Sequence, residues 1–248
     1  MAARTKLEIC TASVEDCVAA ERGGADRIEL NCALMLGGLT PSPGALIEAR
    51  AAVKIPLIAM IRPRAGGFCY SATEFKVLQR DAELALANGA DGIAFGILTA
   101  SGEIDLERSR EIIALGAGRQ LVFHRAFDVT PHPQLALDQL IDLGVTRVMT
   151  SGQEASAYNG AKKIRELIQR AGGRIEVLPA GGINRFCLSD VLIRTGCDQV
   201  HASLSTGRKD LSVLGRPQVS FGGVLRPPEE EFPVTDERAV SGLRSILG

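Results

Sequence analysis

The residues best suited to chemistry in this chain follow an apolar segment of strand length. The run Leu121-Val122-Phe123 leads directly into His124-Arg125-Ala126-Phe127-Asp128, which contains an imidazole, a guanidinium group and a carboxylate. Charged groups at the end of a buried strand cost free energy unless they face water, a partner or a ligand. His124 is suited to moving protons near neutral pH. This segment therefore predicts a polar site where a strand ends.

Carboxylates and arginines occupy similar positions in other apolar segments. Glu8 and Glu29 lie in two separate strand-like segments, and Arg62 follows a third. Two carboxylates in one pocket raise a carboxyl pKa, which suits a general acid or base, and an arginine fork binds a carboxylate or a phosphate. The candidate catalytic residues are Glu8, Glu29, Arg62, His124, Arg125 and Asp128.

Glycines and hydroxyl groups at further strand ends predict a phosphate cradle. Gly181-Gly182 follows one apolar segment and precedes a helical one, as in barrels where backbone N–H groups face an anion. Ser151-Gly152 stands in the same relation to the preceding segment. The candidate ligand- or phosphate-binding residues are Arg64, Ser151, Gly152, Gly181, Gly182, His201 and Ser203.

Each of these signals also has a purely structural explanation. Glu8 could pair with Arg62 only to neutralise a charge in the core, Arg64 could anchor a loop, and Gly181-Gly182 could serve close packing. His132, between two prolines, is expected in an exposed loop. These explanations must account for polar ends on most strands at once, which is why we favour one shared pocket.

A repeated turn pattern separates the elements that would position these residues. Gly24, Gly89, Gly144 and Gly196 each follow a helical pattern and precede a short apolar run, and glycine suits the left-handed residue just past a helix. Strands are expected to begin near Leu7, Arg27, Pro56, Gly92, Gln120, Arg147, Glu176 and Gln199. Helices are expected at Val14–Arg22, Pro43–Ala52, Ala72–Asn88, Leu106–Leu115, Gln134–Leu143, Ala157–Ala171 and Cys187–Thr195.

Strict alternation of strands and helices predicts an α/β fold with parallel strands and right-handed crossovers. Eight such strands favour a single-domain (β/α)8 TIM-like barrel over residues 1–248. The alternative, a doubly wound sheet, lacks a GxGxxG motif after the first strand. After the eighth strand we expect a long loop or arm at 203–233 and a C-terminal helix at 235–247. The arm would cover the site, reach a neighbouring subunit or remain a solvated loop.

The composition narrows the classes of partner. The 248 residues are 46% hydrophobic and 23% charged with a net charge of -1, so nothing favours nucleic acid or an anionic membrane. No apolar run approaches the roughly 20 residues of a membrane span, and the N-terminal segment lacks a signal-like apolar region. We expect a cytoplasmic protein with a small anionic ligand. Its six cysteines form no CxxC pair and are expected to be reduced.

Several of these segments together resemble the CutC family over about residues 6–205. They are Glu8-Ile9-Cys10, Arg27-Ile28-Glu29-Leu30, Gly37-Gly38-Leu39-Thr40-Pro41-Ser42, Met60-Ile61-Arg62-Pro63-Arg64, Phe123-His124-Arg125-Ala126-Phe127-Asp128 and Thr150-Ser151-Gly152. The resemblance implies a TIM-like barrel in a cytoplasmic homo-oligomer, a dimer or a tetramer, named for copper homeostasis. It also implies binding of copper(I).

The copper ligands implied by the resemblance are two thiols at the ends of the first and second strands. Cys10 matches the first position, but Asn31 occupies the second and the cysteine follows one place later, at Cys32. A shift of one residue turns a strand side chain to the opposite face. Cys10 and Cys32 are the candidate metal ligands, and Met35 or Met60 could assist because copper(I) favours soft ligands.

Two functional hypotheses remain open at this point. In the first, the chain is a copper homeostasis protein that holds copper(I) through Cys10 and Cys32. In the second, it is a barrel enzyme of unassigned reaction that acts on a small anionic or phosphorylated substrate. The candidate catalytic carboxylates, guanidinium groups and imidazole favour the second hypothesis, because they are hard or borderline groups.

Overall fold

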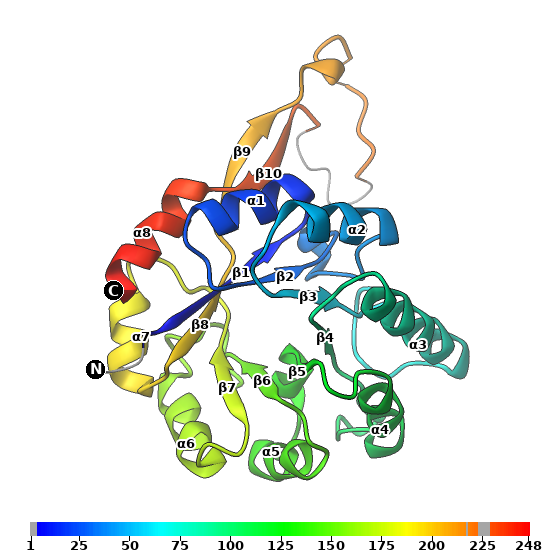
Figure 1. Cartoon of the computed structure of the whole chain (residues 1–248), viewed down its shortest axis with the longest axis vertical. Helices are drawn as coiled ribbons and strands as arrows, with labels where there is room; N and C mark the ends of the chain where they lie inside the picture. Colours follow the sequence, from blue (N-terminus) through cyan, green and yellow to red (C-terminus); the bar gives the residue numbers. More distant parts are fainter. Residues whose placement is uncertain (1–3, 217, 223–228) are drawn as a thin grey trace.

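Eight parallel strands form the centre of the protein in a computed structural model, which describes residues 4–216, 218–222 and 229–248. The strands are β1 (Lys6–Thr11), β2 (Arg27–Leu30), β3 (Leu57–Met60), β4 (Gly92–Phe95), β5 (Gln120–Phe123), β6 (Arg147–Thr150), β7 (Glu176–Pro179) and β8 (Gln199–Ala202). Neighbours pair in sequence order from β1 to β7, and β8 pairs with β1. Because β7 and β8 also lie side by side, the sheet curves into a barrel (Figure 1). The predicted (β/α)8 barrel is confirmed.

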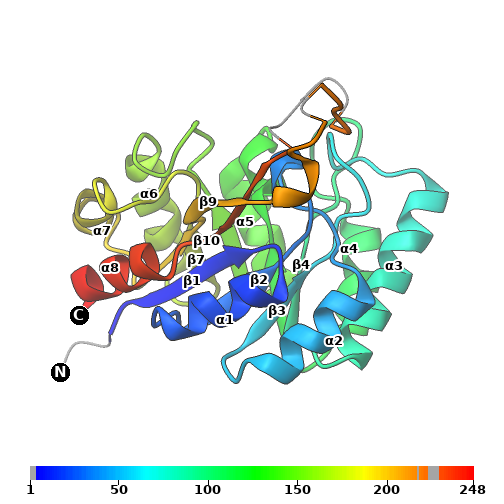
Figure 2. The ribbon, with the colours of Figure 1, turned by 90° about the horizontal axis from the view of Figure 1, so that it is seen from above.

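The helices surround this barrel (Figures 1 and 2). They are α1 (Val14–Arg22), α2 (Pro43–Ala52), α3 (Ala72–Ala87), α4 (Leu106–Leu115), α5 (Pro133–Asp142), α6 (Ala161–Ala171), α7 (Leu188–Thr195) and α8 (Glu237–Leu247). The largest departure from the predicted bounds is the start of α6, which was expected at Ala157. The backbone N–H of Ala157 instead donates to the Gly181 carbonyl at 2.9 Å, so the chain remains non-helical until residue 161.

Alternation along the strands separates two packed regions. Leu7, Ile9 and Ile28 point outward and belong to the large apolar core that the helices complete. A second, smaller apolar cluster fills part of the barrel interior. Its members are Ile58, Met60, Ala94, Val122, Met149, Leu178 and Ala180, and all of them come from β3 to β7 or from the residue after β7. Near the mouth, the interior positions of β1, β2 and β8 are polar and those of β3 to β7 are apolar, whereas Gln120, Arg147 and Glu176 are polar residues at the lower ends of β5, β6 and β7.

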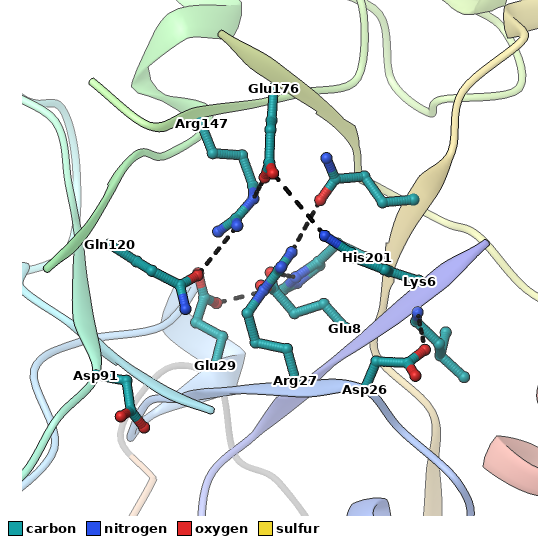
Figure 3. Close-up of polar contacts among 12 residues, drawn as sticks. Lys6, Glu8, Asp26, Arg27, Glu29, Asp91, Gln120, Arg147, Glu176 and His201 are labelled. Carbon is teal, nitrogen blue, oxygen red and sulfur yellow. Dashed lines mark hydrogen bonds and ion pairs between the residues drawn. The ribbon is translucent and has the colours of Figure 1, made fainter. Parts of the chain in front are cut away.

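A network of buried polar side chains lies inside the barrel below its mouth (Figure 3). Arg27 donates to Glu8 through Nε and to Gln199 Oε1 through Nη2, the latter at 3.0 Å. Arg147 lies across the barrel and donates to Glu176 at 2.7 Å. Glu8 therefore pairs with Arg27, the residue beside it in the β1–β2 register, and not with Arg62. Each buried charge in this network has an opposite charge or a polar partner, as burial requires.

The segment after β8, where a long loop or arm was expected at 203–233, contains a regular hairpin. Strands β9 (Ser205–Lys209) and β10 (Glu231–Thr235) pair antiparallel and project from the barrel (Figure 1). The backbone N–H of Thr235 donates to Asp16 Oδ1 at 2.6 Å, which ties the base of the hairpin to α1. The Pro-rich acidic tract of this arm is Arg226-Pro227-Pro228-Glu229-Glu230-Glu231, and its first three residues lie outside the described residues. No helix in the described part of the chain is long and apolar enough to cross a membrane.

Replacing Arg27 by leucine is expected to destabilise the fold by about 3–5 kcal/mol, because Glu8 would remain buried without its guanidinium partner. Urea unfolding of the Arg27→Leu protein measures this loss. The matched control is Arg170→Leu, which removes the more exposed ion pair with Asp138. That change is expected to cost about 1 kcal/mol or less. Equal losses in the two variants would show that the buried pair has no special role.

Candidate functional site

A cavity of about 120 Å³ opens at the carboxyl ends of the strands. Side chains from or just after β1, β2, β3, β5, β6 and β8 converge on it, as expected for the site of a (β/α)8 barrel. The lining residues are Cys10, Glu29, Asn31, Gly37, Met60, Arg62, Phe68, His124, Arg125, Met149 and His201. The predicted shared pocket thus brings together residues from six strands.

Three potential metal ligands meet on the polar side of this cavity. One donor atom from each of Cys10, Glu29 and His201 lies within 4.8 Å of the other two, and His201 Nε2 is 3.9 Å from Glu29 Oε2. The strand register explains the cluster, because Cys10 is paired with Glu29 and Glu8 with His201. A thiolate, a carboxylate and an imidazole together form a typical ligand set for zinc-like divalent ions.

Glu8 lies one layer below these ligands and orients one of them. Its Oε1 is 2.7 Å from His201 Nδ1, which leaves Nε2 on the side of Glu29 (Figure 3). A carboxylate on the far nitrogen is the usual way to fix the ring of a metal-binding histidine. Glu8 does not line the cavity, so it acts on the site through His201.

The buried charges of this cluster shift one another's pKa values. Burial would raise the pKa of Glu8, but Arg27 and His201 outweigh it and lower that pKa below its ordinary value. Burial raises the pKa of Glu29 and of the Cys10 thiol. Burial opposes the charged form of His201, yet Glu29, Cys10 and Glu8 together raise its pKa well above the ordinary value. The cluster therefore holds protons that a metal ion would displace.

Asn31, and not Cys32, is the residue beside Cys10. The Asn31 amide donates to Cys10 Sγ at 3.4 Å and to Glu29 Oε2 at 3.0 Å. The Cys32 thiol donates to the Thr40 carbonyl at 3.1 Å, and the Cys32 backbone pairs with Leu39. Cys32 does not line the cavity. The structure therefore brings one of the two implied thiols to the site, because the one-residue shift turns the second away.

The two methionines considered as helpers lie in different places. Met60 lines the cavity, together with Met149, which the sequence argument missed. Met35 lies in the loop after β2 and is 56% exposed. Two thioethers are thus present in the same lining as the carboxylate of Glu29.

His124 and Arg62 form another part of the lining. His124 caps a short 3₁₀ helix (Arg125–Val129), since its Nδ1 accepts from the backbone N–H of Ala126 at 3.1 Å. Burial and the charge of Arg62 lower the pKa of His124 to about 3, so the ring is neutral at physiological pH. Arg62 donates to the carbonyls of Leu36, Gly38 and Gly66 and thereby connects two loops at the mouth.

Arg125 and Asp128 shape the rim of the cavity. Arg125 donates to Asp128 at 2.8 Å and to Ser151 Oγ at 2.9 Å. Asp128 also accepts from the backbone N–H groups of Ser151 and Gln153. Asp128 therefore fixes the loop after β6. Arg125 is exposed and contributes to the outer rim of the cavity lining.

The residues predicted to bind phosphate do not share one place. Of the seven, His201 lines the cavity and the other six lie outside its lining. Arg64 pairs with Glu74 and donates to loop carbonyls, as the loop-anchor explanation expects. Gly181 packs against Arg125 and Ser151. Gly152 lies close to the backbone of Gly160. The Gly182 carbonyl accepts from the Asn184 side chain, and Ser203 is exposed.

Residues 5–206 match the CutC family. A CutC family protein of Treponema denticola is 49% identical over 92% of this chain and 93% of its own length. The human copper homeostasis protein cutC homolog is 43% identical over 97% of this chain and 88% of its own length. A CutC structure from Streptococcus agalactiae superposes with a TM-score of 0.76 at 32% identity, covering 79% of this chain and 97% of that one. By sequence and by structure, this chain belongs to the CutC family.

Proposed function

We propose that this chain is a copper homeostasis protein whose metal centre consists of Cys10, Glu29 and His201. The observation that carries the proposal is the convergence of three different donor atoms within 4.8 Å at the mouth of the barrel. The names of the human and mouse relatives support the link to copper. Copper is the cargo in this proposal, and the barrel supplies its ligands.

The donor set fits a metal ion in three respects. Glu8 orients His201 so that Nε2 lies toward Glu29. Glu29 Oε1 is buried without a hydrogen-bond partner among the described residues. The carboxylate is a hard ligand, and only one thiol lines the cavity, so we expect weaker binding of copper(I) than a pair of thiolates would give. A borderline divalent ion such as zinc suits the same three ligands.

The proposal includes a reducing compartment, the cytoplasm, and assembly into a homo-oligomer. All six cysteines are free thiols, which agrees with the chemistry of a reducing compartment. The arm after β8 exposes apolar side chains, notably Leu211, Leu214 and Phe221. Exposed apolar groups on a projecting arm suit contact with a neighbouring subunit.

Replacing Cys10 by serine is expected to weaken copper(I) binding at least about tenfold, because the only thiol of the proposed centre is lost. Competition against a chromophoric copper(I) chelator measures the affinity. Cys32→Ser is the matched control and is expected to bind like the unchanged protein, since Cys32 donates to Thr40 outside the cavity. Equal losses in both variants would favour the Cys10–Cys32 pair instead, and unchanged binding in both would exclude a thiolate site.

Replacing Asn31 by cysteine is expected to strengthen copper(I) binding at least about tenfold, because the Asn31 side chain already contacts Cys10 Sγ and a second thiolate suits this soft ion. The same competition assay measures the gain. Zinc affinity, measured in parallel, separates a specific copper(I) effect from a general one. No gain in copper(I) affinity would show that position 31 does not face the bound metal.

A further inference from the structure

The cavity at the barrel mouth collects polar atoms that lack partners. Among the described residues, seven buried side-chain nitrogen or oxygen atoms have no hydrogen-bond partner, and four of them belong to residues that line this cavity. The four are Glu29 Oε1, Asn31 Oδ1, Arg62 Nε and His124 Nε2. Buried polar groups are normally satisfied, so a cluster of four in one place indicates that a ligand completes the hydrogen bonds.

Two of these atoms, His124 Nε2 and Arg62 Nε, are hydrogen-bond donors. His124 Nδ1 accepts from the backbone N–H of Ala126, so the proton of the neutral ring is on Nε2. Arg62 Nε always carries a proton, since the guanidinium group donates only. The ring of Phe68 packs against both residues, with its centroid 5.2 Å from Arg62 Cζ and 5.1 Å from the centre of the His124 ring. The two donors therefore lie on the same side of the cavity, beneath one aromatic ring.

The charge of Arg62 indicates the charge of the ligand. Three arginines are buried in the described part of the chain, namely Arg27, Arg62 and Arg147. Arg27 pairs with Glu8 and Arg147 with Glu176, whereas the described residues place no carboxylate within 4 Å of Arg62. Its guanidinium donates only to neutral carbonyls. A buried cation without an anion is costly, so an anionic group on the ligand is favoured here.

The other two atoms are acceptors from neighbouring positions of the second strand and its end. Asn31 uses its amide nitrogen for Cys10 and Glu29, which leaves Oδ1 as a free acceptor. Glu29 accepts from Asn31 through Oε2, which leaves Oε1. A ligand that meets these acceptors needs a donor such as a hydroxyl group.

We propose that this cavity binds a small hydroxy acid, with its carboxylate accepting from Arg62 and His124 and its hydroxyl group donating to Glu29 Oε1 beside Asn31. The cavity volume of about 120 Å³ suits a small ligand of this kind. Since Phe68 packs over both donors, the loop that carries it moves when the carboxylate reaches them. This site goes beyond the proposed metal centre and shares only Glu29 with it.

Metal-free protein titrated with lactate and glycolate tests the proposal by calorimetry. Acetate, which has the carboxylate alone, and ethylene glycol, which has hydroxyl groups alone, are the matched compounds. Saturable binding of a hydroxy acid, at least about tenfold tighter than acetate, is the expected result, because a buried acceptor then gains its donor. Binding of inorganic phosphate in place of the hydroxy acids, or no saturable binding of either hydroxy acid, would overturn the proposal.

The variant His124→Asn assigns the binding to this cavity. Asparagine keeps an acceptor for the Ala126 N–H but lacks the Nε2 donor, so the fold is retained while affinity for the hydroxy acid falls at least about tenfold. His132→Asn, in an exposed loop, is the control and is expected to bind normally. Unchanged binding by His124→Asn would overturn the assignment.

Failure of this proposal is distinguishable from failure of the metal centre. Cys10→Ser removes a metal ligand but none of the four unpartnered atoms, whereas His124→Asn removes one of these atoms but no metal ligand, so the two variants report on the two proposals separately. If the protein binds copper(I) but no hydroxy acid, only the hydroxy acid proposal is wrong. The metal proposal fails alone if Cys10→Ser binds copper(I) normally.

Discussion

The contact between Glu8 and His201 is the interaction on which the mouth of this barrel depends. It is buried, and Arg27 keeps Glu8 ionised from the side opposite His201. Through this chain of contacts the lower layer of the barrel sets the ring orientation in the upper layer. Arg27 below, Glu8 in the middle and His201 above form one chain of contacts. The packed core therefore fixes the orientation of the His201 ring at the site.

The asymmetry of the barrel interior follows from the same arrangement. Near the mouth, β1, β2 and β8 contribute polar side chains and β3 to β7 contribute apolar ones, whereas the network below extends across the barrel, because Arg147 on β6 contacts Gln120 and Glu176. The cavity lies where the polar and the apolar strands meet. Its lining therefore combines the carboxylate of Glu29 and the imidazole of His201 with the thioethers of Met60 and Met149.

Sequence reasoning succeeded where a short period governs the structure. Eight apolar runs alternating with helical patterns predicted the eight strands of the barrel, and the glycines after four of the helices marked where strands begin. It failed where the depth of a residue along the barrel axis, or the conformation of a loop, decides which side chains reach the cavity. Glu8 was expected at the mouth, but strand ends alone do not reveal that it lies one layer below. The partner of Glu8 depends on the β1–β2 register, and Phe68 belongs to a loop with no periodicity.

Position 31 lies two residues after Glu29, so both side chains face the cavity. Cys32, one residue later, faces away and donates to the Thr40 carbonyl. The consequence of Asn31 concerns oxidation. Two thiols in contact can be joined as a disulfide, whereas the lining of this cavity contains the single thiol of Cys10. An amide in place of the second sulfur thus leaves the pocket without an internal route to a disulfide.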